Sequence, residues 1–125
     1  MKFINESIKH LIRAARHSYW GLRAVFRTER AFRIEVFLSV FLVPLAFFIG
    51  NTLWERVLLI GSWFFVLLIE LINTAIETII NRISRDHHPE SGRAKDIGSA
   101  IVLVSAIQAA FFWGMLGIPW FIKLI

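Results

Sequence analysis

The chain has 125 residues, of which 57% are hydrophobic and 18% are charged, and its mean hydropathy is +0.64. A soluble domain of this length is about half apolar and about a quarter charged, so the composition indicates a small integral membrane protein. The absence of cysteine excludes a disulfide framework and any metal site built on thiolates. The net charge of +5 has to be explained by where the basic residues lie.

Residues 3–27 have the pattern of an amphipathic helix. Apolar side chains recur at helical spacing along one face, and basic side chains from Lys9 to Arg27 occupy the flank and the opposite face. Such a helix lies in a membrane interface with its cationic side toward anionic headgroups. Nucleic-acid binding is the rival interpretation, but it would leave the apolar face in water. We therefore expect an interfacial helix and no nucleic-acid partner.

Three apolar segments are long enough to cross a membrane. The sequence predicts them at residues 31–50, 55–73 and 97–118, and the second helix should continue past the membrane surface to Ser84. Basic residues are concentrated in the N-terminal segment and in a polar connection over residues 82–96. By the positive-inside rule both lie in the cytoplasm and the C-terminus lies on the opposite side. We predict one all-α membrane domain over residues 1–125, with the interfacial helix followed by three transmembrane helices.

The second predicted span changes character within residues 63–81. It begins as an apolar helix and then acquires five polar side chains that share one face: Glu70, Asn73, Thr74, Glu77 and Asn81. Ionisable groups among Leu and Ile at membrane depth are costly and indicate a functional site. The alternative is a seam of hydrogen bonds that only holds helices together, although such seams use Asn, Thr or Ser more often than Glu.

The predicted topology brings these groups to the cytoplasmic rim together with other charged residues. Glu29 and Glu77 offer hard oxygen ligands of the kind that bind Mg²⁺ together with substrate phosphates. Lys95 can offset phosphate charge, and Glu70, among apolar neighbours, is a candidate general base. The set suits phosphoryl transfer to a hydroxyl presented from the lipid phase. A small ion-coupled transport subunit and a purely structural membrane subunit are the alternatives from other classes.

Two stretches of the chain resemble the prokaryotic diacylglycerol kinases, which are small three-span enzymes of the bacterial inner membrane: ELINTAIETIINRI and HPESGRAKDIGSA. The segments RAARHSYWGLRA and ERAFRIE also fit, so the resemblance covers nearly the whole chain. The form S-G-R-A-K-D-x-G-S is similar to the Gram-negative diacylglycerol kinases. Related undecaprenol kinases usually differ there and are the alternative with the same chemistry.

The resemblance implies ATP-dependent phosphorylation of diacylglycerol to phosphatidic acid, as part of phospholipid metabolism. It also implies Mg²⁺ as cofactor and a homotrimer whose subunits share active sites. The implied location is the bacterial cytoplasmic membrane.

Carried onto matching positions, the resemblance assigns roles to single residues. It makes Glu70 the base that takes the lipid hydroxyl proton, makes Asn73 its catalytic support, and assigns the metal to Glu29 and Glu77. The implied ATP contacts are His10, His17, Glu29, Glu77, Asp86, His87, His88, Lys95 and Asp96. The implied lipid contacts are His10, Ala14, Ala15, Ser18, Arg23, Ala31, Arg33, Glu35, Arg56, Glu70, Ser99 and Trp113. Three positions depart from the family pattern: His10 stands for Arg, His17 for Tyr, and Asn81 for Asp.

Overall fold

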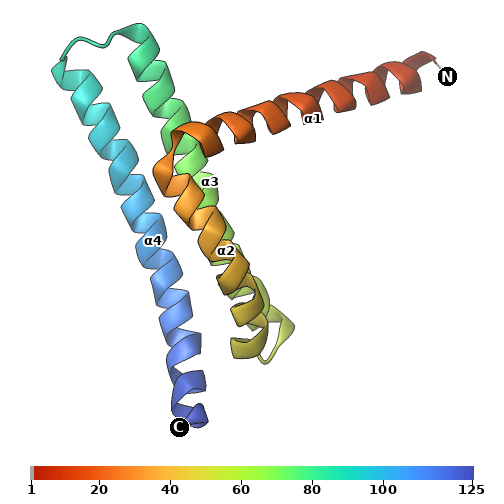
Figure 1. Cartoon of the computed structure of the whole chain (residues 1–125), viewed down its shortest axis with the longest axis vertical. Coiled ribbons are helices and arrows are strands. Elements are labelled where there is room, and N and C mark those ends of the chain that lie inside the picture. The colour runs from red at the N-terminus through yellow and green to blue at the C-terminus, as the bar shows by residue number, and fades with distance from the viewer. Residues whose placement is uncertain (1) are drawn as a thin grey trace.

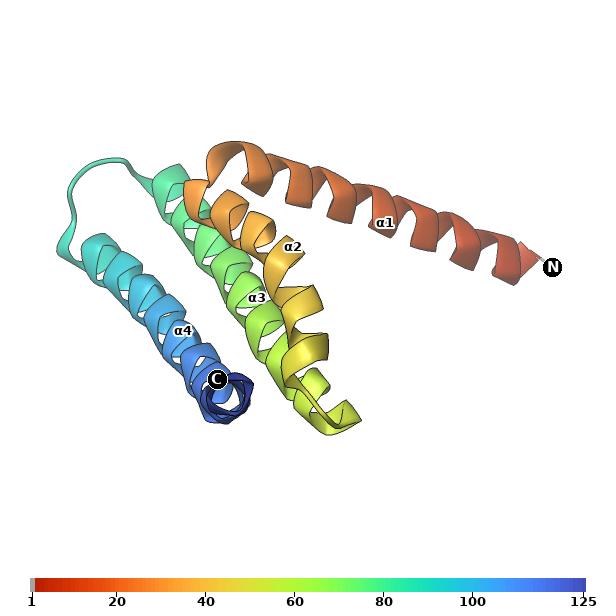
Figure 2. The same cartoon turned by 60° about the horizontal axis from the view of Figure 1, so that its bottom comes forward.

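The structure is a computed structural model that describes residues 2–125, apart from the side chain of Lys2, as four helices. The helices are α1 (Lys2–Thr28), α2 (Arg30–Ile49), α3 (Leu53–Ile83) and α4 (Pro89–Leu124). Helices α2, α3 and α4 run side by side, whereas α1 projects away from them (Figure 1). The turned view shows the same arrangement (Figure 2), with α3 between α2 and α4. The predicted all-α fold is confirmed.

Helices α2, α3 and α4 are each long and apolar enough to cross a membrane, as the sequence predicts. Little of their apolar surface is covered within one chain, and large side chains such as Phe41, Phe65 and Phe111 are exposed. Phe and Leu outside a bundle are typical of surface that faces lipid or another subunit. The fold therefore depends on its surroundings as well as on its own core.

The turn between α2 and α3 is built from local hydrogen bonds. The Thr52 hydroxyl accepts a bond from the Glu55 backbone N–H (3.2 Å), and the Glu55 carboxylate accepts one from the Thr52 N–H (3.2 Å). This reciprocal capping box satisfies two donors that the start of a helix leaves without partners. Arg56 Nε donates to the Gly50 carbonyl (3.0 Å) across the same turn. A Cβ at Gly50 would collide with the Arg56 side chain, so the turn requires glycine there.

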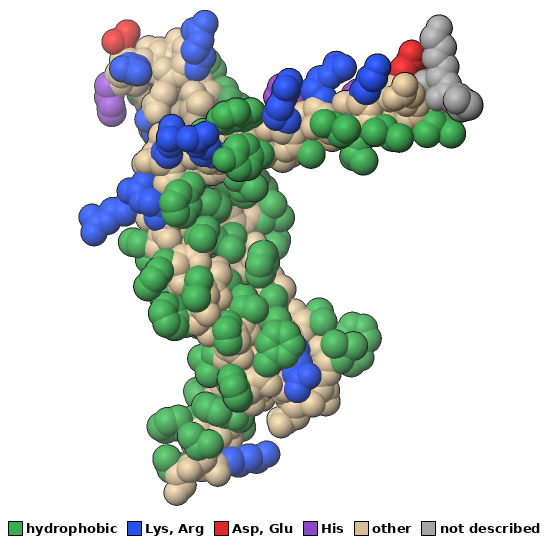
Figure 3. Space-filling view, turned by 45° about the vertical axis from the view of Figure 1, so that its right-hand side comes forward, with side chains coloured by type: hydrophobic (Ala, Val, Ile, Leu, Met, Phe, Trp, Pro, Cys, Tyr) green, Lys and Arg blue, Asp and Glu red, His purple; other side chains and the backbone are tan. Residues whose placement is uncertain are grey.

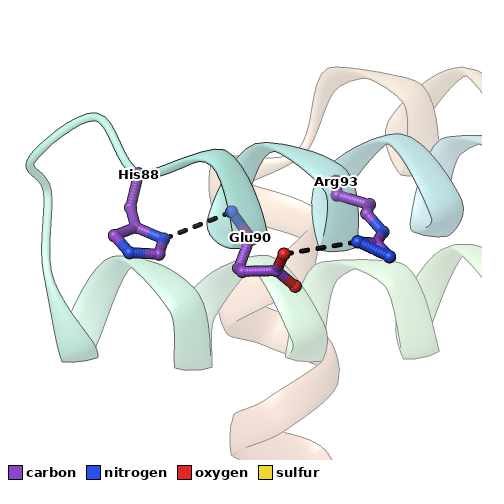
Figure 4. Close-up of polar contacts among 3 residues, drawn as sticks. All are labelled: His88, Glu90 and Arg93. Carbon is purple, nitrogen blue, oxygen red and sulfur yellow. Dashed lines mark hydrogen bonds and ion pairs between the residues drawn. The ribbon is translucent and has the colours of Figure 1, made fainter.

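The connection between α3 and α4 is shorter than the polar segment 82–96 that the sequence predicts. Helix α4 begins at Pro89 because His88 and Glu90 supply the features of a helix start. The Nδ1 atom of His88 accepts a hydrogen bond from the Glu90 backbone N–H (3.2 Å), and the Glu90 carboxylate pairs with Arg93 (3.3 Å) (Figure 4). Proline in the first helical turn and an acidic residue near the positive end of the helix dipole both favour this start.

The buried core lies at the end of the bundle that is far from α1. Ala46, Ile49 and Leu59 form its centre, and the Trp113 ring packs against them while its Nε1 donates to the Leu59 carbonyl (3.1 Å). A second indole bond joins α3 to α2, from Trp63 Nε1 to the Ser39 hydroxyl (2.8 Å). These contacts hold the far half of the bundle together, while the half near α1 combines the buried Phe32, Val66 and Leu67 with the polar residues of α3.

Candidate functional site

Glu70 on α3 is a buried acidic residue. Only 6% of its surface is exposed, and the neighbouring Thr74 on the same face of α3 is 8% exposed. Glu29 and Glu77 are close enough to Glu70 for their charges to act on it, and Glu70 acts in turn on Glu35. Four carboxyl groups from the α1–α2 junction, α2 and α3 therefore gather at the end of the bundle where α1 joins. Several negative charges at one end of the bundle favour a cationic ligand there.

Glu29 occupies the one residue that separates α1 from α2. It is the N-cap residue of α2, with extended backbone angles (φ −97°, ψ 115°), yet its side chain makes no capping hydrogen bond. The side chain is half-buried. An acidic side chain at an N-cap normally bonds to the first turn of its own helix. Because the Glu29 carboxylate makes no such bond, it is available to a ligand.

Asn73 links the carboxyl groups near Glu70 to α4. Its Nδ2 donates to Glu77 Oε1 (3.4 Å), while its Oδ1 is buried and has no hydrogen-bond partner among the described residues. The Asn73 side chain lies directly against the backbone of the buried Gly98, where a Cβ would collide with it. Gly98 is a site residue that sequence reasoning missed. The sequence shows a glycine two residues after Asp96. A glycine alone does not indicate which side chain packs against it.

A hollow of about 170 Å³ lies beneath the α3–α4 connection. It is lined by four of the residues predicted to contact ATP, namely Asp86, His87, His88 and Lys95. Lys95 Nζ donates to Asn81 Oδ1 (2.9 Å). Because Asn81 is neutral, this bond holds the Lys95 ammonium in place without cancelling its charge. Asp96, another of the residues that the resemblance implies as ATP contacts, is exposed and is not part of the lining.

Residues Ser84, Ser91 and Gly92 also line this hollow and were missed by the sequence reasoning. Ser84 is the C-cap residue of α3, and Ser91 and Gly92 lie in the first turn of α4. The sequence places all three in a polar connection, and its composition gives no information on which side chains face inward.

The residues predicted on α1 lie along an exposed helix. His10, His17, Ala14, Ala15 and Ser18 are all exposed, and most of α1 projects beyond the bundle (Figure 1). The Ser18 hydroxyl bonds only to the Ala14 carbonyl of its own helix (3.1 Å). Within one chain the structure therefore does not bring His10 or His17 to the hollow beside Lys95.

The two faces of α1 differ in chemistry. In Figure 3 hydrophobic side chains cover the side of α1 that is turned toward the spanning helices, and basic side chains cover the opposite side. The Arg23 guanidinium lies over the Trp20 ring (5.3 Å). Such a segregation suits a helix at a membrane surface, with its apolar side down and its cations toward water and headgroups.

The other predicted lipid contacts are spread along the bundle. Glu35 is half-buried, and its Oε2 has no hydrogen-bond partner among the described residues. Ala31 and Ser99 are exposed. Arg56 precedes Glu70 by fourteen residues of α3, which is about 21 Å along the helix axis. Arg56, like Trp113 in the far core, is therefore too distant to touch a group that reacts beside Glu70.

An apolar groove of about 500 Å³ runs between the end of α1 and the helices α2 and α3. Sequence reasoning did not single out its lining, which belongs to the ordinary apolar pattern of three helices: Leu22, Phe26, Phe32, Val36, Ser39, Phe64, Leu67, Leu68 and Leu71. The groove follows the half of the bundle that holds Glu70, since Leu67 and Leu71 flank that residue on α3.

The acidic residues could hold a divalent cation only with help. Across residues 2–125 no three His, Asp or Glu side chains come close enough together to bind a metal ion by themselves. Glu29 and Glu77 are both close enough to Glu70 for their charges to act on it, so each can offer carboxylate oxygens at this end of the bundle. Mg²⁺ that is bound with substrate phosphates takes one or two carboxylates from the protein, so this donor set fits such an ion.

Comparison with known proteins adds an independent result. The family described as prokaryotic diacylglycerol kinase matches residues 16–116. The chain is 44% identical over 107 residues to a diacylglycerol kinase of Haemophilus influenzae, which covers 86% of this chain and 91% of that protein. It is 42% identical over 106 residues to a diacylglycerol kinase of Escherichia coli K12, and the match covers 85% of this chain and 87% of that protein. A diacylglycerol kinase of Pseudomonas aeruginosa is 40% identical over 106 residues, covering 85% of this chain and 86% of the relative. The chain belongs to the prokaryotic diacylglycerol kinase family.

Proposed function

We propose that this protein transfers the γ-phosphoryl group of ATP to the hydroxyl of diacylglycerol and thereby produces phosphatidic acid. The observation that carries the proposal is the buried Glu70, which lies near Glu29 and Glu77 at the end of a membrane-spanning bundle. Membership of the diacylglycerol kinase family supplies the substrate class. The apolar groove beside Glu70 offers a path for acyl chains, and the hollow beside Lys95 offers a polar site for the nucleotide.

In the reaction, Glu70 accepts the proton of the lipid hydroxyl. The hydroxyl oxygen forms a bond to the γ-phosphorus, and the bond from that phosphorus to the bridging oxygen breaks, so that its electron pair leaves with ADP. Catalysis of this kind depends mostly on positioning and on neutralising charge. Glu70 meets the first requirement because a buried side chain on a packed helix has a fixed position. Asn73, held between Glu77 and Gly98, supports the same geometry.

Charge neutralisation falls to Lys95 and to a divalent cation. Glu29 and Glu77 would hold Mg²⁺ together with phosphate oxygens, and the ion would offset the charge of the β- and γ-phosphates. Lys95, which Asn81 holds without neutralising it, would contact the nucleotide beside Asp86, His87 and His88. His10, His17 and Asp96 are further nucleotide contacts that the family resemblance implies.

A homotrimer with shared sites would resolve two features of the single chain. His10 and His17 lie on an exposed helix away from the nucleotide hollow, and the spanning helices leave most of their apolar surface uncovered. If α1 of one subunit covers the nucleotide hollow of the next, His10 and His17 reach the nucleotide. If the spanning helices of the subunits also pack against one another, their apolar surface is covered as well. We further propose that the protein lies in the bacterial cytoplasmic membrane, with the α1 helix and the α3–α4 connection on the cytoplasmic side.

The test is transfer of labelled phosphate from ATP in mixed micelles that contain either diacylglycerol or undecaprenol, with and without Mg²⁺. We expect labelled diacylglycerol that depends on Mg²⁺. Labelling of undecaprenol alone would keep the chemistry and overturn the substrate. If neither lipid is labelled, the protein is not this kinase, and ion flux through liposomes without ATP consumption would instead establish a transport subunit.

A further inference from the structure

Arg33 lies one turn into α2 but its guanidinium points back to α1. Its Nη1 donates hydrogen bonds to the carbonyl oxygens of Phe26 (3.1 Å) and Arg27 (2.8 Å), both in the last turn of α1. Its own backbone N–H donates to the Glu29 carbonyl (3.3 Å). One side chain thus joins the end of α1 to the start of α2.

The end of α1 needs such a partner. The last four carbonyl oxygens of a helix have no N–H donor within that helix, and they lie at the negative end of the helix dipole. The Val25 carbonyl is bonded to the Glu29 N–H (2.8 Å) across the junction. Arg33 takes the next two carbonyls and brings a positive charge to the same point. The guanidinium therefore satisfies both the hydrogen-bonding and the electrostatic demand of this helix end.

The junction decides where the rest of α1 lies. The last turns of α1 are bonded to α2 through Arg33 and line the apolar groove with Leu22 and Phe26, and the rest of α1 projects outward (Figures 1 and 2). His10 is sixteen residues before Phe26, which is about 24 Å along the helix. A swing of about 10° at the junction would move His10 by about 4 Å, and displacements of about 1 Å can abolish most of a rate.

We propose that Arg33 is a positioning residue that fixes the angle between α1 and α2 and, through it, the place of Glu29. The resemblance to the family assigns Arg33 to the lipid substrate, whereas its hydrogen bonds join it to the protein backbone. The proposal depends on the proposed function only in its kinetic test, because the angle of α1 can be measured without turnover.

The direct test is a distance measurement between spin labels. The chain has no cysteine, so labels can be placed at Asn5→Cys on α1 and Ile83→Cys at the exposed end of α3. Labelled protein is diluted with unlabelled protein so that only distances within one chain contribute. We expect a narrow distribution for the parent, a broad one for Arg33→Gln and an intermediate one for Arg33→Lys, which keeps the charge but loses the planar fork. Arg30→Gln removes an exposed charge on the same turn and should leave the distribution narrow.

The kinetic test separates positioning from substrate contact. If Arg33 positions Glu29, Arg33→Gln should raise the Mg²⁺ concentration for half-maximal activity about tenfold, which is the size of effect expected from the loss of a charged hydrogen bond. The KM for diacylglycerol should change less than about twofold. Arg33→Lys should recover part of the loss, and Arg30→Gln should behave like the parent. A distribution in Arg33→Gln as narrow as the parent's would overturn the proposal. A raised KM for diacylglycerol with unchanged Mg²⁺ dependence would do the same, and it would leave the kinase function intact.

Discussion

At the scale of the residue, Glu70 combines burial with nearby carboxyl groups in a way that suits proton transfer. Its replacement Glu70→Gln keeps the size and polarity of the side chain but removes the group that accepts a proton. We expect turnover to fall by about 10² to 10⁴, the range typical of a lost general base, with ATP binding little changed. Glu77→Gln should instead weaken binding of Mg²⁺ and ATP. Phosphate transfer in micelles and nucleotide titration distinguish the two, and normal turnover of Glu70→Gln would refute its role as base.

Gly98 leaves room for the side chain of Asn73, which we propose supports the reaction. In Gly98→Ala the new methyl group would meet the Asn73 amide, so Asn73 has to move and its bond to Glu77 is lost. We expect turnover to fall by about 10- to 100-fold, because small displacements in a site of this kind are costly. Gly114→Ala is the matched control on α4, since nothing lies within 4 Å of a Cβ there. Full activity of Gly98→Ala would mean that Asn73 does not depend on this contact.

The site residues divide into those that sequence can and cannot reveal. Glu70, Asn73 and Glu77 follow from a local rule, because charged and amide groups inside an apolar helix stand out from the pattern. The contact of Gly98 with Asn73 and the bond from Arg33 to the end of α1 depend on how helices pack. The hydrophobic periodicity of one segment does not indicate which residues of another segment it contacts.

At the scale of the element, the sequence predicts some helix starts better than others. The sequence predicts where α2 and α3 begin to within about two residues. It predicts a long polar connection after α3, whereas α4 begins at Pro89, because His88, Pro89 and Glu90 together make a helix start inside a polar stretch. Polarity indicates exposure, and an exposed segment can still be helical.

Removing the capping box at Thr52 should lower stability without lowering activity. Thr52→Ala removes the acceptor of the Glu55 N–H, and we expect the free energy of unfolding to fall by about 1 kcal/mol. Activity per folded molecule should be unchanged, because Thr52 lies about 27 Å along α3 from Glu70. Thermal unfolding in detergent and phosphate transfer measure the two effects. Asn51→Ala is the control, since Asn51 contributes only its backbone N–H to the turn. An unchanged melting temperature in Thr52→Ala would show that the turn is held by Arg56 and Gly50 instead.

At the scale of the whole molecule, polar chemistry and stable packing occupy opposite ends. The core around Leu59 and Trp113 holds the far end, while the carboxyl groups, the hollow beside Lys95 and the apolar groove lie toward the opposite end. This division suits an enzyme that takes one substrate from water and the other from the membrane. The sequence predicts that the polar groups gather at one rim of the membrane, but it does not predict the packed core at the other end. It also does not give the placement of α1 relative to any neighbouring subunit, since that contact involves a second chain.

The orientation of the whole molecule follows from the same division and can be tested with single cysteines. Asn51 lies in the α2–α3 turn and Lys123 near the end of α4, whereas Glu90 lies at the start of α4 beside the hollow that we propose binds the nucleotide. All three are exposed. ATP is cytoplasmic, so a site at that hollow requires Glu90 inside and the other two outside, in agreement with the positive-inside rule. A membrane-impermeant maleimide added to intact spheroplasts should label Asn51→Cys and Lys123→Cys but label Glu90→Cys only after lysis. The reverse pattern would leave the nucleotide site without ATP and would overturn the proposed orientation, and labelling of all three before lysis would mean that α2, α3 and α4 do not span the membrane.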